Sequence, residues 1–70
     1  MKKAILISDN TSINRVKKIF KNIKNITNDI DTLRGEKYDE IIIVDGTNIK
    51  NFEYIMDTLK SISDKITFYI

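Results

Sequence analysis

Short runs of branched apolar residues alternate with longer polar stretches along the chain. Residues 4–7 read AILI before Ser8-Asp9, and residues 41–44 read IIIV before Asp45-Gly46. Runs this short, apolar on both faces and closed by a turn signal, predict buried strands. The run at 41–44 is expected to be the central strand. A third strand is expected at residues 65–70, KITFYI, where Thr67 and Tyr69 alternate with apolar residues.

Between these strands, apolar residues recur at the spacing of an amphipathic helix. A first helix is expected over about residues 12–25, with Thr11 or Ser12 as its cap, because a hydroxyl there can accept an unpaired N–H. A second helix is expected after Gly46, with Thr47 or Asn48 as its cap, and a loop at residues 61–65. The predicted buried stripes are Ile13, Val16, Phe20 and Ile23 in the first helix, and Ile49, Phe52, Met56 and Leu59 in the second.

Residues 26–38 are ambiguous and leave two folds open. In one, this segment holds a short strand and a helical turn starting at Asp31, which gives a four-stranded parallel sheet in the order 2-1-3-4 with helices on both faces (α/β, flavodoxin-like). In the other, it forms a hairpin with the central strand, which gives the ferredoxin-like β-α-β-β-α-β fold. A similarity between the two halves at a shift of 36 residues, 40 − 4, favours the hairpin. Strands apolar on both faces favour the parallel sheet, which we prefer.

Composition sets limits on the chemistry. Seventy residues make one domain, residues 1–70, and the net charge of +2 is too small to indicate nucleic acid by itself. The chain has no His and no Cys, which excludes Ser-His and Cys-His nucleophiles and a structural zinc site of the usual type. A bound metal would be a hard cation held by oxygen, such as Mg²⁺.

In both folds the strands at residues 4–7 and 41–44 are parallel neighbours, so Asp9 and Asp45 are expected at the same edge of the sheet. Ligands of open parallel sheets bind at that edge, where the strand order reverses. Asp9, Asn10 and Asp45 are therefore the candidate Mg²⁺ or phosphoryl site. The simpler interpretation is that each Asp lies at a helix N-terminus, where a negative charge is favourable by about 0.3–1 kcal/mol.

These residues resemble a known family. KKAILISDN followed by an amphipathic helix, then LRGEKYDEIIIVDG, a helix and KITFYI, resembles the opening part of a response-regulator receiver domain (CheY-like). The resemblance implies that Asp9 and Asn10 match the acidic pair that holds Mg²⁺, and that Asp45 matches the phosphoacceptor. It covers about four of the usual five strands, with Asn10 in place of one acid. The chain is thus expected to be a degenerate or truncated receiver.

Two surfaces are candidates for contacts with partners. The first helix region is basic, and no acid occurs between Asn10 and Asn28; Lys17, Lys21 and Lys24 are expected on one helical face. The last strand is expected at the edge of the sheet, where an apolar strand can pair with another chain. The basic residues are Arg15, Lys17, Lys18, Lys21 and Lys24, and the edge residues are Ile66, Phe68 and Ile70.

The preferred function is a small, non-catalytic regulatory module that binds a protein partner or forms a homodimer, without a cofactor. One alternative is an Mg²⁺-dependent phosphoryl-handling domain, a phosphoacceptor or a hydrolase that uses Asp9 and Asp45. A third is a nucleic-acid binder that uses the basic first helix. No apolar run is long enough to span a bilayer, so no membrane contact and a cytoplasmic location are expected.

Overall fold

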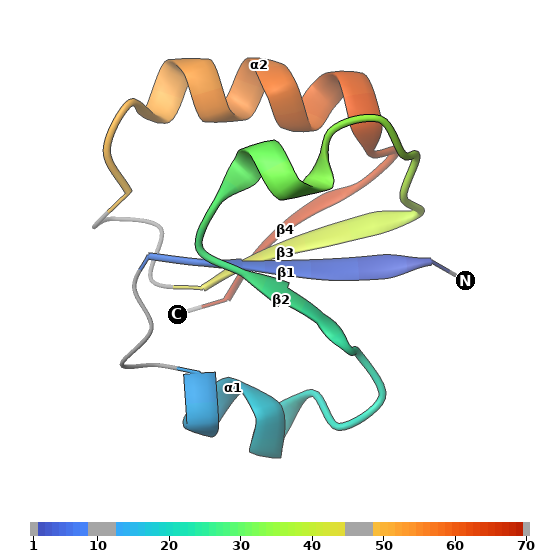
Figure 1. Ribbon diagram of the computed structural model, residues 1–70, viewed down its shortest axis with the longest axis vertical. Coiled ribbons are helices and arrows are strands. Elements are labelled where there is room, and N and C mark those ends of the chain that lie inside the picture. Colours follow the sequence, from blue (N-terminus) through green and yellow to red (C-terminus); the bar gives the residue numbers. More distant parts are fainter. Residues whose placement is uncertain (1, 9–12, 45–48, 70) are drawn as a thin grey trace.

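The computed structural model describes residues 2–8, 13–44 and 49–69. The described strands form one parallel sheet with helical segments on both faces (Figure 1). The strand order is β2-β1-β3-β4, which confirms the preferred fold and shows that the ferredoxin-like alternative is wrong. In chain order the elements are β1 (Lys3–Ile7), α1 (Ile13–Ile19), β2 (Asn25–Thr27), the 3₁₀ helix η2 (Ile30–Leu33), β3 (Glu40–Val44), α2 (Phe52–Ile62) and β4 (Ile66–Tyr69).

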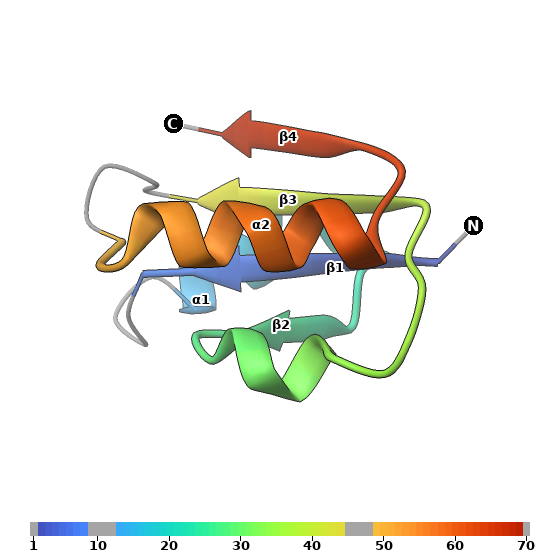
Figure 2. The same cartoon turned by 90° about the horizontal axis from the view of Figure 1, so that it is seen from above.

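The two central strands explain the apolar runs in the sequence. β1 and β3 pair in register from Lys3 and Glu40 to Ile7 and Val44. All five residues of β3 are buried, because helices cover both faces of the sheet. Figure 2 shows α2 running above β1 and β3, with η2 beside it over β2. β4 pairs with β3 on one side and forms an edge of the sheet.

The side chains on the two faces form separate apolar clusters. The α2-side cluster lies between the sheet and the segments α2 and η2, and the α1-side cluster lies between the sheet and α1. Figure 1 shows α2 and α1 on opposite faces of the sheet. The buried members of the α2-side cluster are Ala4, Leu6, Ile30, Leu33, Tyr38, Ile41, Ile43, Leu59 and Ile62. The buried members of the α1-side cluster are Ile5, Ile7, Val16, Ile42 and Val44.

The first helix is shorter than the sequence predicts. α1 ends at Ile19, and the chain turns through hydrogen bonds from the Phe20 N–H to the Val16 carbonyl and from the Ile23 N–H to the Phe20 carbonyl. Residues 25–27 then pair with β1 as strand β2. Backbone pairing with a buried strand, and the packing of Ile23 against the α1-side cluster, replace the predicted last turns of the helix.

The second helix is displaced towards the C-terminus relative to the prediction. It begins at Phe52, after Asn51 in the left-handed region (φ 57°), and includes Ser61 and Ile62, which the sequence analysis places in a loop. Phe52 is 44% exposed and does not belong to the buried stripe. The predicted caps of both long helices lie outside the described residues. Asp29, rather than Asp31, caps η2 by accepting the Asp31 N–H at 3.0 Å. Among the described residues, no helix is long and apolar enough to cross a membrane.

Candidate functional site

The carboxyl ends of β1 and β3 lie side by side, as the sequence analysis expects. Their last residues, Ile7 and Val44, are register partners and are both buried. Asp9, Asn10 and Asp45 follow these ends in the sequence and lie outside the described residues. Within the described ranges, no group of three or more acidic side chains is placed to hold a metal ion. The Mg²⁺ and phosphoacceptor sites therefore stay predictions.

The basic residues of the first helix region do not form the single helical face that the sequence predicts. Lys17 and Lys18 lie in the last turn of α1, whereas Lys21 and Lys24 come after the helix ends. All four side chains are exposed. Arg15 also lies on α1 and is exposed. The early end of α1 thus divides the predicted patch into a helical part and a part that follows the helix.

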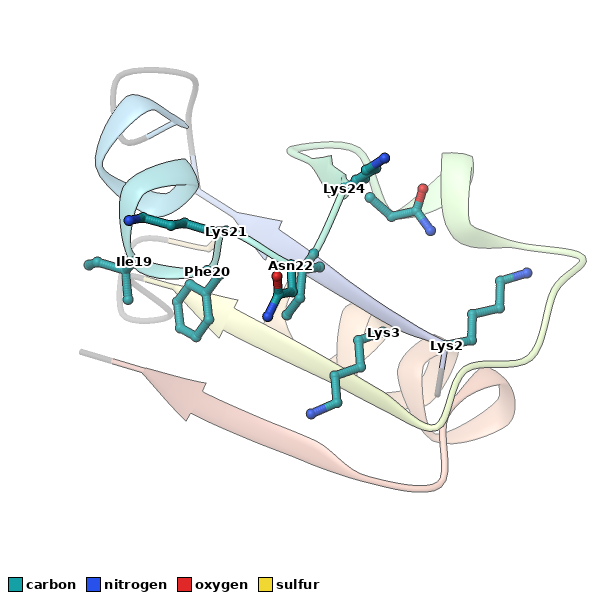
Figure 3. A pocket seen from close by; sticks show the side chains of 9 residues that line it. Lys2, Lys3, Ile19, Phe20, Lys21, Asn22 and Lys24 are labelled. Carbon is teal, nitrogen blue, oxygen red and sulfur yellow. The ribbon is translucent and has the colours of Figure 1, made fainter.

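Lys21 and Lys24 line a pocket at the amino end of the sheet, which we call the amino-end pocket (Figure 3). Its volume is about 600 Å³. Its wall comes from the start of β1, the end of α1 and the connection to β2. The lining residues are Lys2, Lys3, Ile19, Phe20, Lys21, Asn22, Ile23, Lys24 and Asn25. The pocket therefore brings Lys2 and Lys3 together with Lys21 and Lys24, which lie apart from them in the sequence.

Two of these four lysines already have acidic partners. The Lys2 ammonium lies 3.0 Å from the Glu36 carboxylate, and this contact, with a hydrogen bond from the Tyr38 hydroxyl, lowers the pKa of Glu36. The Lys3 ammonium lies 3.0 Å from the Glu40 carboxylate. Neither Lys21 nor Lys24 forms an ion pair with another described residue. The excess positive charge of the pocket therefore lies on the α1–β2 connection.

Glu40 is a buried carboxylate that the sequence analysis did not single out. It lies at the start of β3 and is 8% exposed. Its carboxylate accepts a hydrogen bond from the Thr67 hydroxyl at 2.5 Å and lies 3.9 Å from the Lys65 ammonium. The Thr67 hydroxyl first, and then Lys3, lower the pKa of Glu40 below its ordinary value of 4.5. Glu40 thus links β1, β3 and β4 through charged and polar contacts on the α1 side.

An aromatic pair lies beside the amino-end pocket. The Phe20 and Tyr69 rings meet edge to face, with centroids 5.2 Å apart. Tyr69 is the register partner of Val44, so its side chain is on the α1 side of the sheet. Tyr69 is 37% exposed. Phe20 was expected in the buried stripe of the helix; it lies just after α1, half-buried against the α1-side cluster, and also lines the pocket wall.

The edge strand β4 carries a second exposed aromatic pair on the opposite face. Phe68 is 50% exposed, and its ring stacks on that of Phe52 with centroids 6.2 Å apart. Ile66 is half-buried against the α2-side cluster, and Ile70 lies outside the described residues. The position of this strand at the sheet edge agrees with the prediction. Its outer side therefore combines strand backbone with apolar side chains.

Comparisons with known proteins do not assign the chain to a family. No family model matches the chain, and neither a curated protein nor a solved structure gives a match. The all-parallel sheet in the order 2-1-3-4 is consistent with a flavodoxin-like α/β fold. The resemblance to receiver domains stays a prediction from the sequence.

Proposed function

We propose that this chain is a small, non-catalytic interaction module that associates with a second copy of itself through strand β4. The observation that carries the proposal is the exposed edge of the sheet, with Phe68 half-exposed and stacked on exposed Phe52. An edge strand offers unpaired backbone N–H and C=O groups, and exposed apolar side chains beside it favour strand addition.

The composition of β4 supports a second copy as the partner. The strand reads ITFY and contains no charged residue. Antiparallel pairing of β4 with β4 of another copy forms a closed two-fold interface, in which the same surface meets itself. Such pairing brings no like charges of the two strands together and buries the exposed Phe68 ring. A domain of this size also gains stability from association, because its own core is small.

The experiment is a measurement of molar mass in solution by light scattering after gel filtration, over a range of concentrations. The 8.2 kDa chain is expected at twice its monomer mass, 2 × 8.2 = 16.4 kDa. The variant Phe68→Lys is expected to return it to the monomer mass, because a buried unpaired charge opposes association. A monomeric wild-type chain at the highest concentration would overturn the proposal.

Tyr54→Lys provides the matched control. Tyr54 is an exposed aromatic on α2, 49% exposed, and its ring centroid lies 5.2 Å from the guanidinium of Arg34, the residue that follows η2. This variant adds the same charge at a similarly exposed ring away from β4, and it is expected to remain dimeric. Equal loss of association in both variants would show that charge, rather than the β4 edge, controls association.

The phosphoryl-handling alternative and the cytoplasmic location stay predictions from the sequence. The residues on which the first depends, Asp9, Asn10 and Asp45, lie outside the described residues. A titration with Mg²⁺, monitored through the amide resonances in NMR spectra, tests the phosphoryl-handling alternative directly. Shifts at these three residues that Asp45→Asn weakens are the expected result for a metal site.

A further inference from the structure

The amino-end pocket offers three kinds of interaction in one place. Lys21 and Lys24 supply positive charge that no described acid neutralises, and Asn22 and Asn25 supply exposed amides. Phe20 supplies an aromatic ring at the wall. The volume of about 600 Å³ lies within the range of ligand pockets. This combination fits a ligand that has both negative charge and flat aromatic groups.

The placement of the lysines indicates an extended ligand. Figure 3 shows Lys21 at the α1 end of the pocket, Lys24 towards β2, and Lys3 across the opening on β1. The ammonium groups are spread around the rim and do not gather at one point. This spread matches several phosphates better than one. A chain of phosphates can contact several of these groups, because its charges follow one another at regular intervals.

The neighbouring sheet surface provides a place for flat rings to stack. α1 has only seven residues and leaves part of this face uncovered. Tyr69, on the α1 side of β4, is therefore 37% exposed. The contact between Tyr69 and Phe20 extends the aromatic surface from the pocket to β4. Nucleic-acid bases stack on such aromatic side chains, and side-chain amides can hydrogen-bond their edges. An acidic peptide would satisfy the lysines but not the aromatic pair.

Glu40 and Glu36 are each paired with a lysine of the pocket. Glu40 is 8% exposed, and its carboxylate contacts Lys3, Thr67 and Lys65. Lys2 contacts Glu36 at 3.0 Å, and the Glu36 side chain is 54% exposed. The charges that remain for a ligand are those of Lys21 and Lys24, with Lys3 as a partly neutralised neighbour.

We infer that the amino-end pocket and the adjoining Phe20–Tyr69 pair bind single-stranded nucleic acid, its phosphates along the lysine rim and its bases against the two rings. The site differs from the helical surface that the sequence analysis considered, because Lys21, Lys24 and Phe20 lie beyond the end of α1. It uses side chains on the α1 side of the sheet rather than the outer edge of β4, and Tyr69 is the residue of β4 that it includes.

The experiment is fluorescence anisotropy of labelled oligouridylate and oligothymidylate of about ten nucleotides, titrated with the full chain. Binding is expected to weaken as salt rises, with a slope of log K against log salt of about −1.4 to −2, since two or three phosphates are neutralised. Tighter binding of one oligonucleotide identifies RNA or DNA as the source of the ligand. No binding of either at about 50 mM salt would overturn the inference.

The matched variants are Lys21→Gln with Lys24→Gln, against Lys50→Gln with Lys60→Gln. Each removes two exposed lysine charges, but the second pair lies outside the amino-end pocket. The first pair is expected to weaken binding about tenfold and to reduce the salt slope by about 1.4, and the second pair to change both little. Equal effects of the two pairs would mean that net charge attracts the oligonucleotide without a defined site.

The aromatic contribution has its own test. Tyr69→Leu removes an exposed ring and is expected to weaken binding about fivefold or more, without changing the salt slope. Since Tyr69 also lies in β4, amide shifts of the wild-type chain give a second measurement. They are expected at Phe20, Asn22 and Asn25. Shifts confined to other residues, or displacement of the oligonucleotide by polyglutamate at equal phosphate and carboxylate concentration, would contradict the inference.

Discussion

The two faces of the sheet are covered to different extents. On one face, α2 with eleven residues and η2 with four cover an apolar cluster that includes Leu59 and Leu33. On the other face, α1 has only seven residues, and the surface near β4 carries Glu40, Thr67 and Tyr69. The α2 side therefore supplies most of the apolar packing, whereas the α1 side near β4 carries the buried Glu40–Thr67 contact and the exposed ring of Tyr69.

The strongest test of this difference is the loss of a buried side chain on each face. Leu59 is 0% exposed and Val16 is 1% exposed. Leu59→Ala is expected to lower the free energy of unfolding by about 3–4 kcal/mol, and Val16→Ala by about 2 kcal/mol. The first loss is a large part of the roughly 4–10 kcal/mol expected for a chain of this size. Urea unfolding, monitored by circular dichroism, measures the free energy of unfolding of both variants. Because Val is the smaller side chain, a loss at Val16 as large as that at Leu59 would show that the α1 side is packed at least as tightly as the α2 side.

A smaller effect is expected from the polar contacts on the α1 side. The pKa of Glu40 is lowered in the folded state, mainly by the Thr67 hydroxyl and then by Lys3. The carboxylate therefore stabilises the fold above its ordinary pKa of 4.5, and this contribution is lost as the pH falls through the lower pKa of the folded state. Glu40→Gln is expected to cost about 1 kcal/mol at pH 7 and less at pH 3.

Urea unfolding of Glu40→Gln at several pH values measures this dependence, with Asp57→Asn as the control for an exposed acid on α2. Some acid sensitivity is expected to remain in Glu40→Gln, because the pKa of Glu36 is lowered as well, by Lys2 and Tyr38. A constant difference between wild type and Glu40→Gln across the pH range would contradict a stabilising carboxylate.

An effect of no more than similar size is expected at the connection that holds η2 on the α2 side. Gly35 follows η2 with φ at 87°, and a Cβ at this position would meet no atom within 4 Å. Gly35→Ala is therefore expected to cost about 1 kcal/mol through backbone strain alone. Gly35→Asn is expected to cost less, since Asn tolerates positive φ. The midpoints of thermal unfolding distinguish the two variants. An unchanged midpoint for Gly35→Ala would show that the connection adjusts without cost.

The sequence pattern predicted the sheet better than it predicted the helix ends. Residues 4–7 and 41–44 are apolar on both faces, which requires cover on both sides and thereby favours parallel strands. The end of α1 depends on a long-range contact, the pairing of Ile26 with Ile5, which local spacing cannot reveal. Helical periodicity continued through Phe20 and Ile23 because both still face the α1-side cluster after the helix has ended.

The candidate sites were predicted only in part. The edge position of β4 followed from the chain order, and the structure confirms it. The amino-end pocket was not predicted, because it joins Lys3 to Lys21 and Lys24 across a connection whose path was assigned to a helix. Glu40 was missed because it appeared only as the polar start of a strand. The signal that could have found it is the register of the two central strands, which pairs Glu40 with Lys3.

The short strand β2 has a consequence for the size of any assembly. It has three residues, against four in β4 and five in each central strand, and η2 lies beside it (Figure 2). Short, flanked edges are poor templates for further strands. Sheet extension through β4 would therefore stop after one addition, because each copy then presents only β2 at its outer ends. The same geometry that favours a pair disfavours an open-ended filament.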